Sequence, residues 1–203
     1  MRKIKLHPFH RFIYWFCRFL CLILFKFIWR LRIKGLEHVP KQGAVLLAAN
    51  HKSYADPPLV GVAMNRPIHF MAKEELFYSR FFGWLITNLN AHPLNRTGSD
   101  IAALKMAKQI LSDQQPLIVF PEGHRIRGRE FGAAKAGVGL LSKLTQSPIV
   151  PIFIDNNADM WKLRRLTVVF GKPLKPDGFE SNQDLANAVM AEIKKLKESL
   201  HSS

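Results

Sequence analysis

From Gly35 onward, short apolar runs alternate with longer amphipathic stretches. The runs predict strands, since a strand covered on both faces of a sheet carries apolar side chains on both. They lie at residues 44–49, 68–72, 91–94, 117–120, 149–154 and 166–170. Helical patterns follow at residues 57–64, 74–88 (one helix or two short ones), 99–112 and 184–200. This alternation predicts an α/β fold with a mixed central sheet flanked by helices.

The first 34 residues depart from this pattern. In residues 12–29, 16 of 18 positions are hydrophobic, and only Arg18 and Lys26 interrupt them. The longest uncharged interior stretch, residues 19–25, is shorter than the roughly 20 apolar residues that a spanning helix needs. On a helix, one side collects the basic residues Arg11, Arg18, Lys26 and Arg30. The segment therefore predicts a helix lying in the membrane interface, with its basic side chains reaching anionic headgroups.

Other interpretations of this segment stay open. It could span the bilayer with its charges snorkelling to the surface. It could be a signal peptide, although no A-x-A-like cleavage site follows. It could also be a core helix, although few soluble proteins hide so many aromatic residues beside four charges. We divide the chain into a basic, aromatic-rich membrane-associating segment at residues 1–34 and an α/β domain at residues 35–203.

The charge balance indicates the kind of partner. The 203-residue chain has 30 basic and 15 acidic residues, a formal charge of +15. Nine of the basic residues precede Glu37, the first acid, so most of the excess lies in the apolar segment. We do not expect nucleic acid as a partner, because no nucleic-acid-binding motif is present. We expect an anionic membrane surface instead. Cys17 and Cys21 suggest neither a disulfide framework nor a zinc site, and we expect no metal.

The first chemically suggestive stretch directly follows the strand predicted at residues 44–49. It reads N-H-K-S-Y-A-D-P and begins at Asn50. His51 is a candidate general base, since imidazole titrates near neutral pH. Asp56 would accept a hydrogen bond from the other ring nitrogen and fix the tautomer. In the alternative interpretation Asp56 only caps a helix and His51 is a loop residue.

Two further polar stretches follow predicted strands. After residues 117–120, Glu122 could orient a substrate hydroxyl or a neighbouring base, Gly123 permits close backbone approach, and Arg125 offers donors suited to phosphate. Between another short strand and the Ser99 helix, Arg96 makes a reasonable anion site. The alternatives are a plain turn with surface charges and a solvated arginine.

Together and in this order, these blocks resemble the glycerolipid acyltransferase family, whose bacterial members acylate 1-acyl-glycerol-3-phosphate to phosphatidic acid. The family's N-H-x4-D-P pattern is present at residues 50–57, and Asn95-Arg96 is similar to its phosphate-binding block. F-P-E-G-T-R appears at residues 120–125 with His124 in the threonine position. Residues 150–152 match V-P-I, residues 73–76 also look like the family, and the resemblance covers roughly residues 35–175. Many members have an acid where Asn95 stands.

The resemblance implies acyl transfer from a thioester to a lysophospholipid hydroxyl, with His51 as base and Asp56 holding the imidazolium. Glu122 and Gly123 would belong to the catalytic site, with backbone N–H groups near Gly123 stabilising the oxyanion. The acceptor would be bound by Arg96, Arg125, Asn50 and His124. The donor would be acyl-CoA or an acyl carrier protein, and no cofactor is required.

The resemblance also implies attachment to the cytoplasmic face of the cell membrane as a peripheral or monotopic protein. The main alternative is a sister acyltransferase with another lysolipid acceptor, which His124 makes plausible. A covalent route through Ser53 is a weaker alternative, since there is no G-x-S-x-G elbow. A lipid-binding scaffold is disfavoured because His51, Asp56, Glu122 and Arg125 are all present. A hydrolase stays possible, since water could replace the acceptor hydroxyl.

Overall fold

The computed structural model describes residues 8–94, 100–126, 128 and 130–202. Within these ranges the strands are β1 (Arg32–Lys34), β2 (Val45–Ala49), β3 (His69–Lys73), β4 (Ala91–Leu94), β5 (Pro116–Val119), β6 (Ile149–Asp155) and β7 (Thr167–Phe170). The α-helices are α1 (Pro8–Trp29), α2 (Asp56–Ala63), α3 (Arg80–Asn88), α4 (Asp100–Ser112), α5 (Gly137–Thr145) and α6 (Asn182–His201). Short 3₁₀ helices lie at Leu36–His38, Glu74–Phe77 and Asn157–Lys162.

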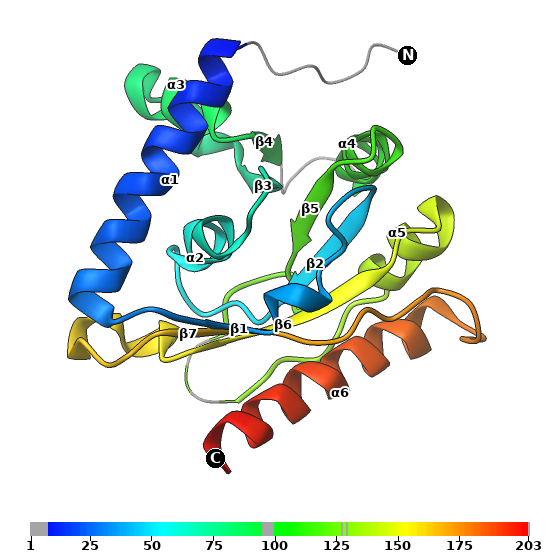
Figure 1. Cartoon of the computed structure of the whole chain (residues 1–203). Coiled ribbons are helices and arrows are strands. Elements are labelled where there is room, and N and C mark those ends of the chain that lie inside the picture. Colours follow the sequence, from blue (N-terminus) through cyan, green and yellow to red (C-terminus); the bar gives the residue numbers. More distant parts are fainter. Residues whose placement is uncertain (1–7, 95–99, 127, 129, 203) are drawn as a thin grey trace.

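The strands form one seven-stranded sheet in the order β1-β7-β6-β2-β5-β3-β4. Neighbouring strands are parallel except for the antiparallel pair β6 and β7. One face packs against α1 and α2, and the other packs against α4, α5 and α6 (Figure 1). The central strand β2 is buried throughout, as its uninterrupted apolar run predicts. The predicted mixed α/β sheet is confirmed.

Two elements escaped the sequence pattern. Strand β1 has only three residues, two of them exposed basic side chains, and is held by pairing with β7. The sheet therefore begins within the segment that the sequence assigns to the membrane. Helix α5 contains two glycines in nine residues, which lowers its intrinsic helix propensity. Gly139 is required there, because a Cβ would lie 2.1 Å from the backbone oxygen of Asn182, the first residue of α6.

Helix α1 lies against the domain through polar anchors. The hydroxyl of Tyr14 accepts a hydrogen bond from the backbone N–H of Ile68, and the indole of Trp29 donates to the backbone oxygen of Met160. Arg18 donates to the backbone oxygens of Val62 and Met64 at the C-terminal end of α2. The prediction that Arg18 reaches lipid headgroups is therefore wrong, because its guanidinium instead satisfies helix-end carbonyls.

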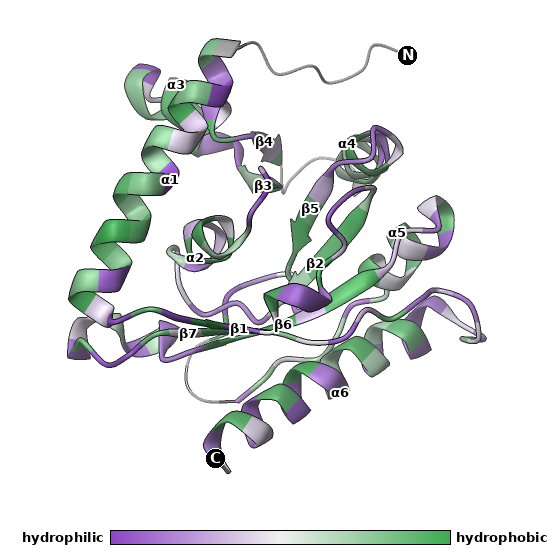
Figure 2. Cartoon of the chain, viewed as in Figure 1, coloured by the Kyte–Doolittle hydropathy of each residue, from purple (hydrophilic) through white to green (hydrophobic). Residues whose placement is uncertain are grey.

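The other side of α1 is apolar and exposed. Figure 2 shows α1 as a mostly hydrophobic helix at the outer side of the molecule. The segment Phe9–Trp29 is long and apolar enough to cross a membrane, by length and composition. We call the nine large exposed side chains of this helix the α1 apolar face: Phe9, Phe12, Phe16, Phe19, Leu20, Ile23, Leu24, Phe27 and Ile28. Isolated exposed apolar residues are ordinary, but a continuous face of this kind marks an interaction surface.

Candidate active site

Three adjacent parallel strands bring the candidate residues together. Strand β2 pairs with β5 on one side and with β6 on the other, both in parallel. Their carboxyl ends therefore meet at one edge of the sheet, where α/β proteins commonly bind ligands. The segments that follow these strands, including the first residue of α2 and of the 3₁₀ helix Asn157–Lys162, hold residues 50–56, 120–126 and 156–157.

His51 and Asp56 form a hydrogen-bonded pair. The Nδ1 atom of His51 lies 2.8 Å from Oδ2 of Asp56, whose side chain is fully buried. Since an ionised carboxylate only accepts, Nδ1 carries the proton and Nε2 is left with a lone pair. The imidazole stacks on the ring of Phe120, with centroids 3.8 Å apart, and remains 14% exposed. The pair has the geometry of a general base and its orienting acid.

Asp56 does not cap its helix. The N-cap of α2 is Ala55 and makes no side-chain capping bond. Oδ2 of Asp56 instead accepts hydrogen bonds from the backbone N–H groups of Lys52 and Ser53, at 2.7 and 2.9 Å. The carboxylate thus shapes the turn that carries His51, and the alternative in which Asp56 is only a helix cap is wrong.

Glu122 is buried and bonded to backbone on both sides. Its two carboxylate oxygens accept from the backbone N–H groups of His51 and Gly132, each at 2.9 Å. The backbone oxygen of His51 accepts a further bond from the N–H of Ile126. Of the two roles predicted for Glu122, this geometry supports orientation of the neighbouring base. It does not support a contact with a substrate hydroxyl.

Asn50 extends the sheet. Its side chain donates to the backbone oxygen of Ile154 at 3.1 Å and accepts from the N–H of the same residue at 2.7 Å. The side chain is completely buried, and both its amide nitrogen and its oxygen are bonded to the backbone of Ile154. The geometry does not support the predicted contact between Asn50 and the substrate. Instead, the side chain of Asn50 joins the end of β2 to β6 and so fixes the backbone position from which His51 extends.

Gly123 has the left-handed φ of +73°, and a Cβ there would lie 2.8 Å from the Lys135 side chain. Its N–H donates to the backbone oxygen of Phe120 at 2.9 Å, so it is not free to bind an oxyanion. Within the described residues, the next two backbone N–H groups, of His124 and Arg125, have no hydrogen-bond partner. Of the amides near Gly123, those of His124 and Arg125 are therefore the candidates for the predicted oxyanion donors.

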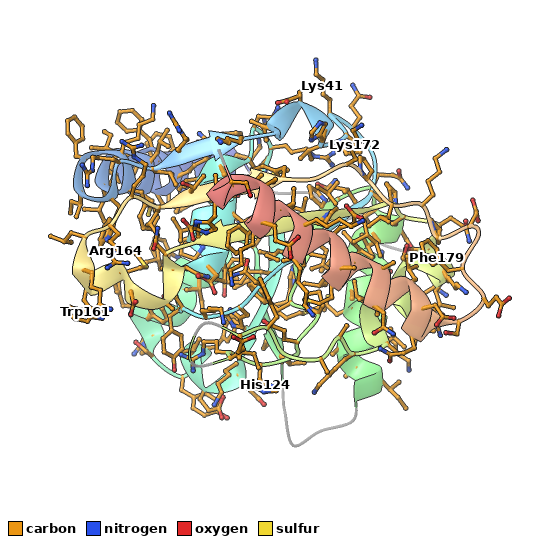
Figure 3. The ribbon with its side chains drawn as sticks, turned by 90° about the horizontal axis from the view of Figure 1, so that it is seen from below. Lys41, His124, Trp161, Arg164, Lys172 and Phe179 are labelled. Carbon is orange, nitrogen blue, oxygen red and sulfur yellow. The ribbon has the colours of Figure 1, made fainter. Side chains whose placement is uncertain are left out.

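Arg125 is exposed and stacks on an aromatic ring. Its Cζ lies 3.5 Å from the ring centroid of Tyr54, which belongs to the same loop as His51. His124 is exposed as well and lies near the margin of the molecule in Figure 3. Arg96 and Asn95 lie outside the described residues, so the anion site expected after β4 stays a prediction.

A pocket of about 400 Å³ adjoins the pair on the side of α6. Asn50 and Lys52, the neighbours of His51, contribute to its wall, as do Arg164 and Lys197. Figure 3 shows the side chain of Arg164 beside the end of the sheet. Within the described ranges, no group of three or more His, Cys, Asp or Glu residues could hold a metal ion.

Two residues of the site were missed at the sequence level. The ring of Tyr54 stacks against the guanidinium of Arg125, and the side-chain amide of Asn157 donates to Oδ1 of Asp56 at 2.8 Å. Asn157 comes shortly after the strand predicted at residues 149–154. Its signal in the sequence is therefore the same as that of His51 and Glu122: a polar residue that follows a predicted strand. Nothing in the sequence separates Tyr54 from an ordinary exposed loop residue.

The chain is similar to a known protein family over more than half of its length. The family model described as Acyltransferase matches residues 30–155. The 1-acyl-sn-glycerol-3-phosphate acyltransferase of Streptococcus pneumoniae is 29% identical over 80% of this chain, which spans 64% of that protein. The Bacillus subtilis enzyme of the same name is 23% identical over 91% of this chain and 96% of its own length.

The fold has a counterpart among solved structures. The crystal structure of the 1-acyl-sn-glycerophosphate acyltransferase PlsC from Thermotoga maritima matches with a TM-score of 0.75 and 24% identity. The match covers 96% of this chain and 88% of that one. The two proteins therefore share their fold.

Proposed function

The chain belongs to the acyltransferase family, and on this premise we propose that it transfers a fatty acyl group from a thioester to 1-acyl-sn-glycerol-3-phosphate. The reaction esterifies the free hydroxyl of the acceptor and yields phosphatidic acid. The observation that carries the proposal is the His51–Asp56 pair, which leaves Nε2 of the imidazole able to accept a proton. The acceptor is the one named for the relatives from S. pneumoniae and B. subtilis.

His51 acts as the general base. As the acceptor oxygen attacks the thioester carbonyl, Nε2 takes the hydroxyl proton, and Asp56 stabilises the imidazolium through Nδ1–H. Collapse of the tetrahedral intermediate breaks the C–S bond, and the imidazolium returns its proton to the departing thiolate. The new C–O bond remains in the product. Such base assistance is worth about 10²–10⁴-fold in rate.

The loop after β5 supplies groups that stabilise the two negative charges of this reaction, the oxyanion and the acceptor phosphate. The backbone N–H groups of His124 and Arg125 are suited to donate to the oxyanion, because no protein group in the described residues occupies them. The guanidinium of Arg125 binds the acceptor phosphate beside His51, supported by its stacking on Tyr54. Arg96 supplies a second phosphate contact, and His124, at the rim, contacts the headgroup.

The donor is acyl-CoA or an acyl carrier protein, and the reaction needs no metal or organic cofactor. Both donors are anionic and would be attracted by the chain's formal charge of +15. Arg164 and Lys197 place positive charge in the wall of the pocket next to the catalytic pair. The polar part of either donor fits such a surface.

The acceptor is amphiphilic and reaches the site from a membrane. The α1 apolar face offers the contact with lipid, and the exposed basic side chains of Arg11 and Lys26 on the same helix add attraction to anionic headgroups. We place the protein on the cytoplasmic face of the cell membrane, where both donors are made. Helix α1 then forms the membrane-associating part, and the acyltransferase domain begins with β1, which pairs with β7 in the sheet.

The test is thiol release by the purified protein in lipid or detergent, with acyl-CoA and acyl carrier protein as separate donors and a panel of lysophospholipids. We expect release that depends on 1-acyl-glycerol-3-phosphate and falls at least about 100-fold in His51→Ala. Release with only another lysolipid would assign a sister activity, which the His124 departure from F-P-E-G-T-R favours as the second candidate. Undiminished release in the His51 variant would refute the general-base role.

A further inference from the structure

Asp56 is held by a residue from a distant part of the chain. Its Oδ2 atom takes three hydrogen bonds, all from the loop of residues 51–53. Its other oxygen, Oδ1, accepts a bond of 2.8 Å from the side-chain amide of Asn157, 101 residues further along. Asn157 is 3% exposed and opens the 3₁₀ helix Asn157–Lys162, just after β6.

This amide fixes the carboxylate in rotation. A carboxylate can turn about its Cβ–Cγ bond, and the three donors on Oδ2 constrain only one of its ends. In the described part of the chain, Asn157 is the partner of Oδ1. Because Asp56 is fully buried, loss of that donor leaves a charged acceptor unsatisfied. The carboxylate would then turn, or draw water from the adjoining pocket, which Asn157 also lines.

The geometry points to Asn157 as a positioning residue for acyl transfer: its amide holds Asp56 so that Oδ2 faces Nδ1 of His51. This inference rests on the proposed function, since it concerns the same reaction. Within the described residues, the hydrogen bond of the Asn157 side chain goes to Asp56 and not to His51. Its effect therefore passes through Asp56 to the orientation and charge of the imidazole, and it acts on kcat and leaves the affinity for the lysophospholipid acceptor unchanged.

The experiment compares Asn157→Leu, which keeps the branched shape of the side chain but removes the donor, with wild type and with Asn187→Leu on the exposed surface of α6. We expect kcat of the first variant to fall on the order of 10–100-fold, with the KM for the lysophospholipid within about threefold. The proton NMR resonance of the His51 Nδ1–H, which a bond to a carboxylate moves downfield, should shift or broaden. Asn187→Leu should match wild type in both measurements.

A second variant separates the effect of the lost hydrogen bond from an effect of misfolding. Asn157→Asp is nearly isosteric and places a carboxyl group opposite Oδ1. When ionised it repels Asp56, whereas when protonated it can donate a hydrogen bond as the amide does. We expect its activity relative to wild type to recover as the pH is lowered, which a merely structural role would not produce.

The outcomes separate the two proposals. A folded Asn157→Leu protein with wild-type kcat and an unchanged Nδ1–H resonance would overturn the role of Asn157. So would an Asn157→Asp protein whose relative activity is independent of pH. Absence of acyl transfer by wild type would instead refute the proposed function, and the NMR comparison would still decide whether Asn157 orients Asp56.

Discussion

The carboxylate of Glu122 holds His51 by its backbone: Oε2 accepts a hydrogen bond from the His51 N–H at 2.9 Å, while Oε1 accepts from Gly132. These two hydrogen bonds, which we call the Glu122 staple, join the loop after β2 to the loop after β5. It holds the backbone that carries the imidazole, so in the proposed reaction Glu122 acts through the position of His51.

Glu122→Gln should therefore weaken the fold as well as the reaction. One of the two backbone N–H groups would face the amide nitrogen of the new side chain and lose its acceptor, at a cost of about 1–3 kcal/mol in the free energy of unfolding. We expect a lower kcat together with a lower midpoint in denaturant. Glu130→Gln, on an exposed side chain, is the control; equal stability of the two variants would contradict the staple.

The stack of Arg125 on Tyr54 predicts an effect on acceptor binding. Tyr54→Leu removes the ring under the guanidinium, and an exposed cation–π contact is worth about 0.5–1 kcal/mol. The KM for the lysophospholipid should rise about two- to fivefold, with the donor KM unchanged. Tyr54→Phe keeps the ring and should behave as wild type. A rise of the same size in both variants would assign the effect to the hydroxyl.

Arg18→Met tests the anchoring of α1. The guanidinium donates to two carbonyls at the end of α2, and charged hydrogen bonds of this kind contribute about 1.5–3 kcal/mol. We expect Arg18→Met to lower the free energy of unfolding, measured in detergent, by this amount and to leave vesicle binding unchanged. Arg11→Met, on an exposed residue of the same helix, should leave stability as it is. Weakened vesicle binding at full stability in Arg18→Met would restore the headgroup role.

The α1 apolar face should carry membrane binding. The triple variant Phe12→Ser, Phe19→Ser, Phe27→Ser removes three side chains that are more than half exposed, so the fold should tolerate it. Sedimentation with vesicles that contain anionic lipid should show binding reduced at least about tenfold. Leu144→Ser, on α5 at the other face of the sheet, serves as the control. Undiminished binding of the triple variant would exclude this face as the lipid contact.

The pair of His69 and His92 predicts how stability depends on pH. Their Nδ1 and Nε2 atoms lie 2.9 Å apart. Burial chiefly, and then His92, lower the pKa of His69 from 6.5 to about 4, against a small opposing effect of Asp113. Between these values the unfolded chain binds a proton that the folded chain does not. Stability should therefore be full above pH 6.5 and fall by up to about 3 kcal/mol as the pH drops to 4.

Replacement of His69 isolates this contribution. His69→Gln should flatten the dependence of the free energy of unfolding on pH between 6.5 and 4, as measured by denaturant titration at a series of pH values. His124→Gln, on an exposed histidine, should leave the slope as it is. An unchanged slope in His69→Gln would assign the acid sensitivity to other groups.

The central strands could be predicted because their signal is local. Strand β2 and strand β6 are uninterrupted apolar runs, and each lies within one residue of its predicted bounds. Strand β1 could not be, since its three residues show no apolar pattern and only pairing with β7 makes them a strand. Helix α5, interrupted by glycines, is likewise stabilised by its contact with α6.

By itself the sequence determined the chemistry of the site: a histidine and an aspartate five residues apart, and an arginine in a block after a later strand, all at strand ends. It could do so because reactive groups and their spacing are local properties of the chain. The tertiary structure alone decided how each group is used. Asn50 and Glu122 turn to backbone, Arg18 turns into the domain, and Asn157 reaches Asp56 across 101 residues. Such roles depend on which buried donors and acceptors meet after folding, and no spacing along the chain encodes that.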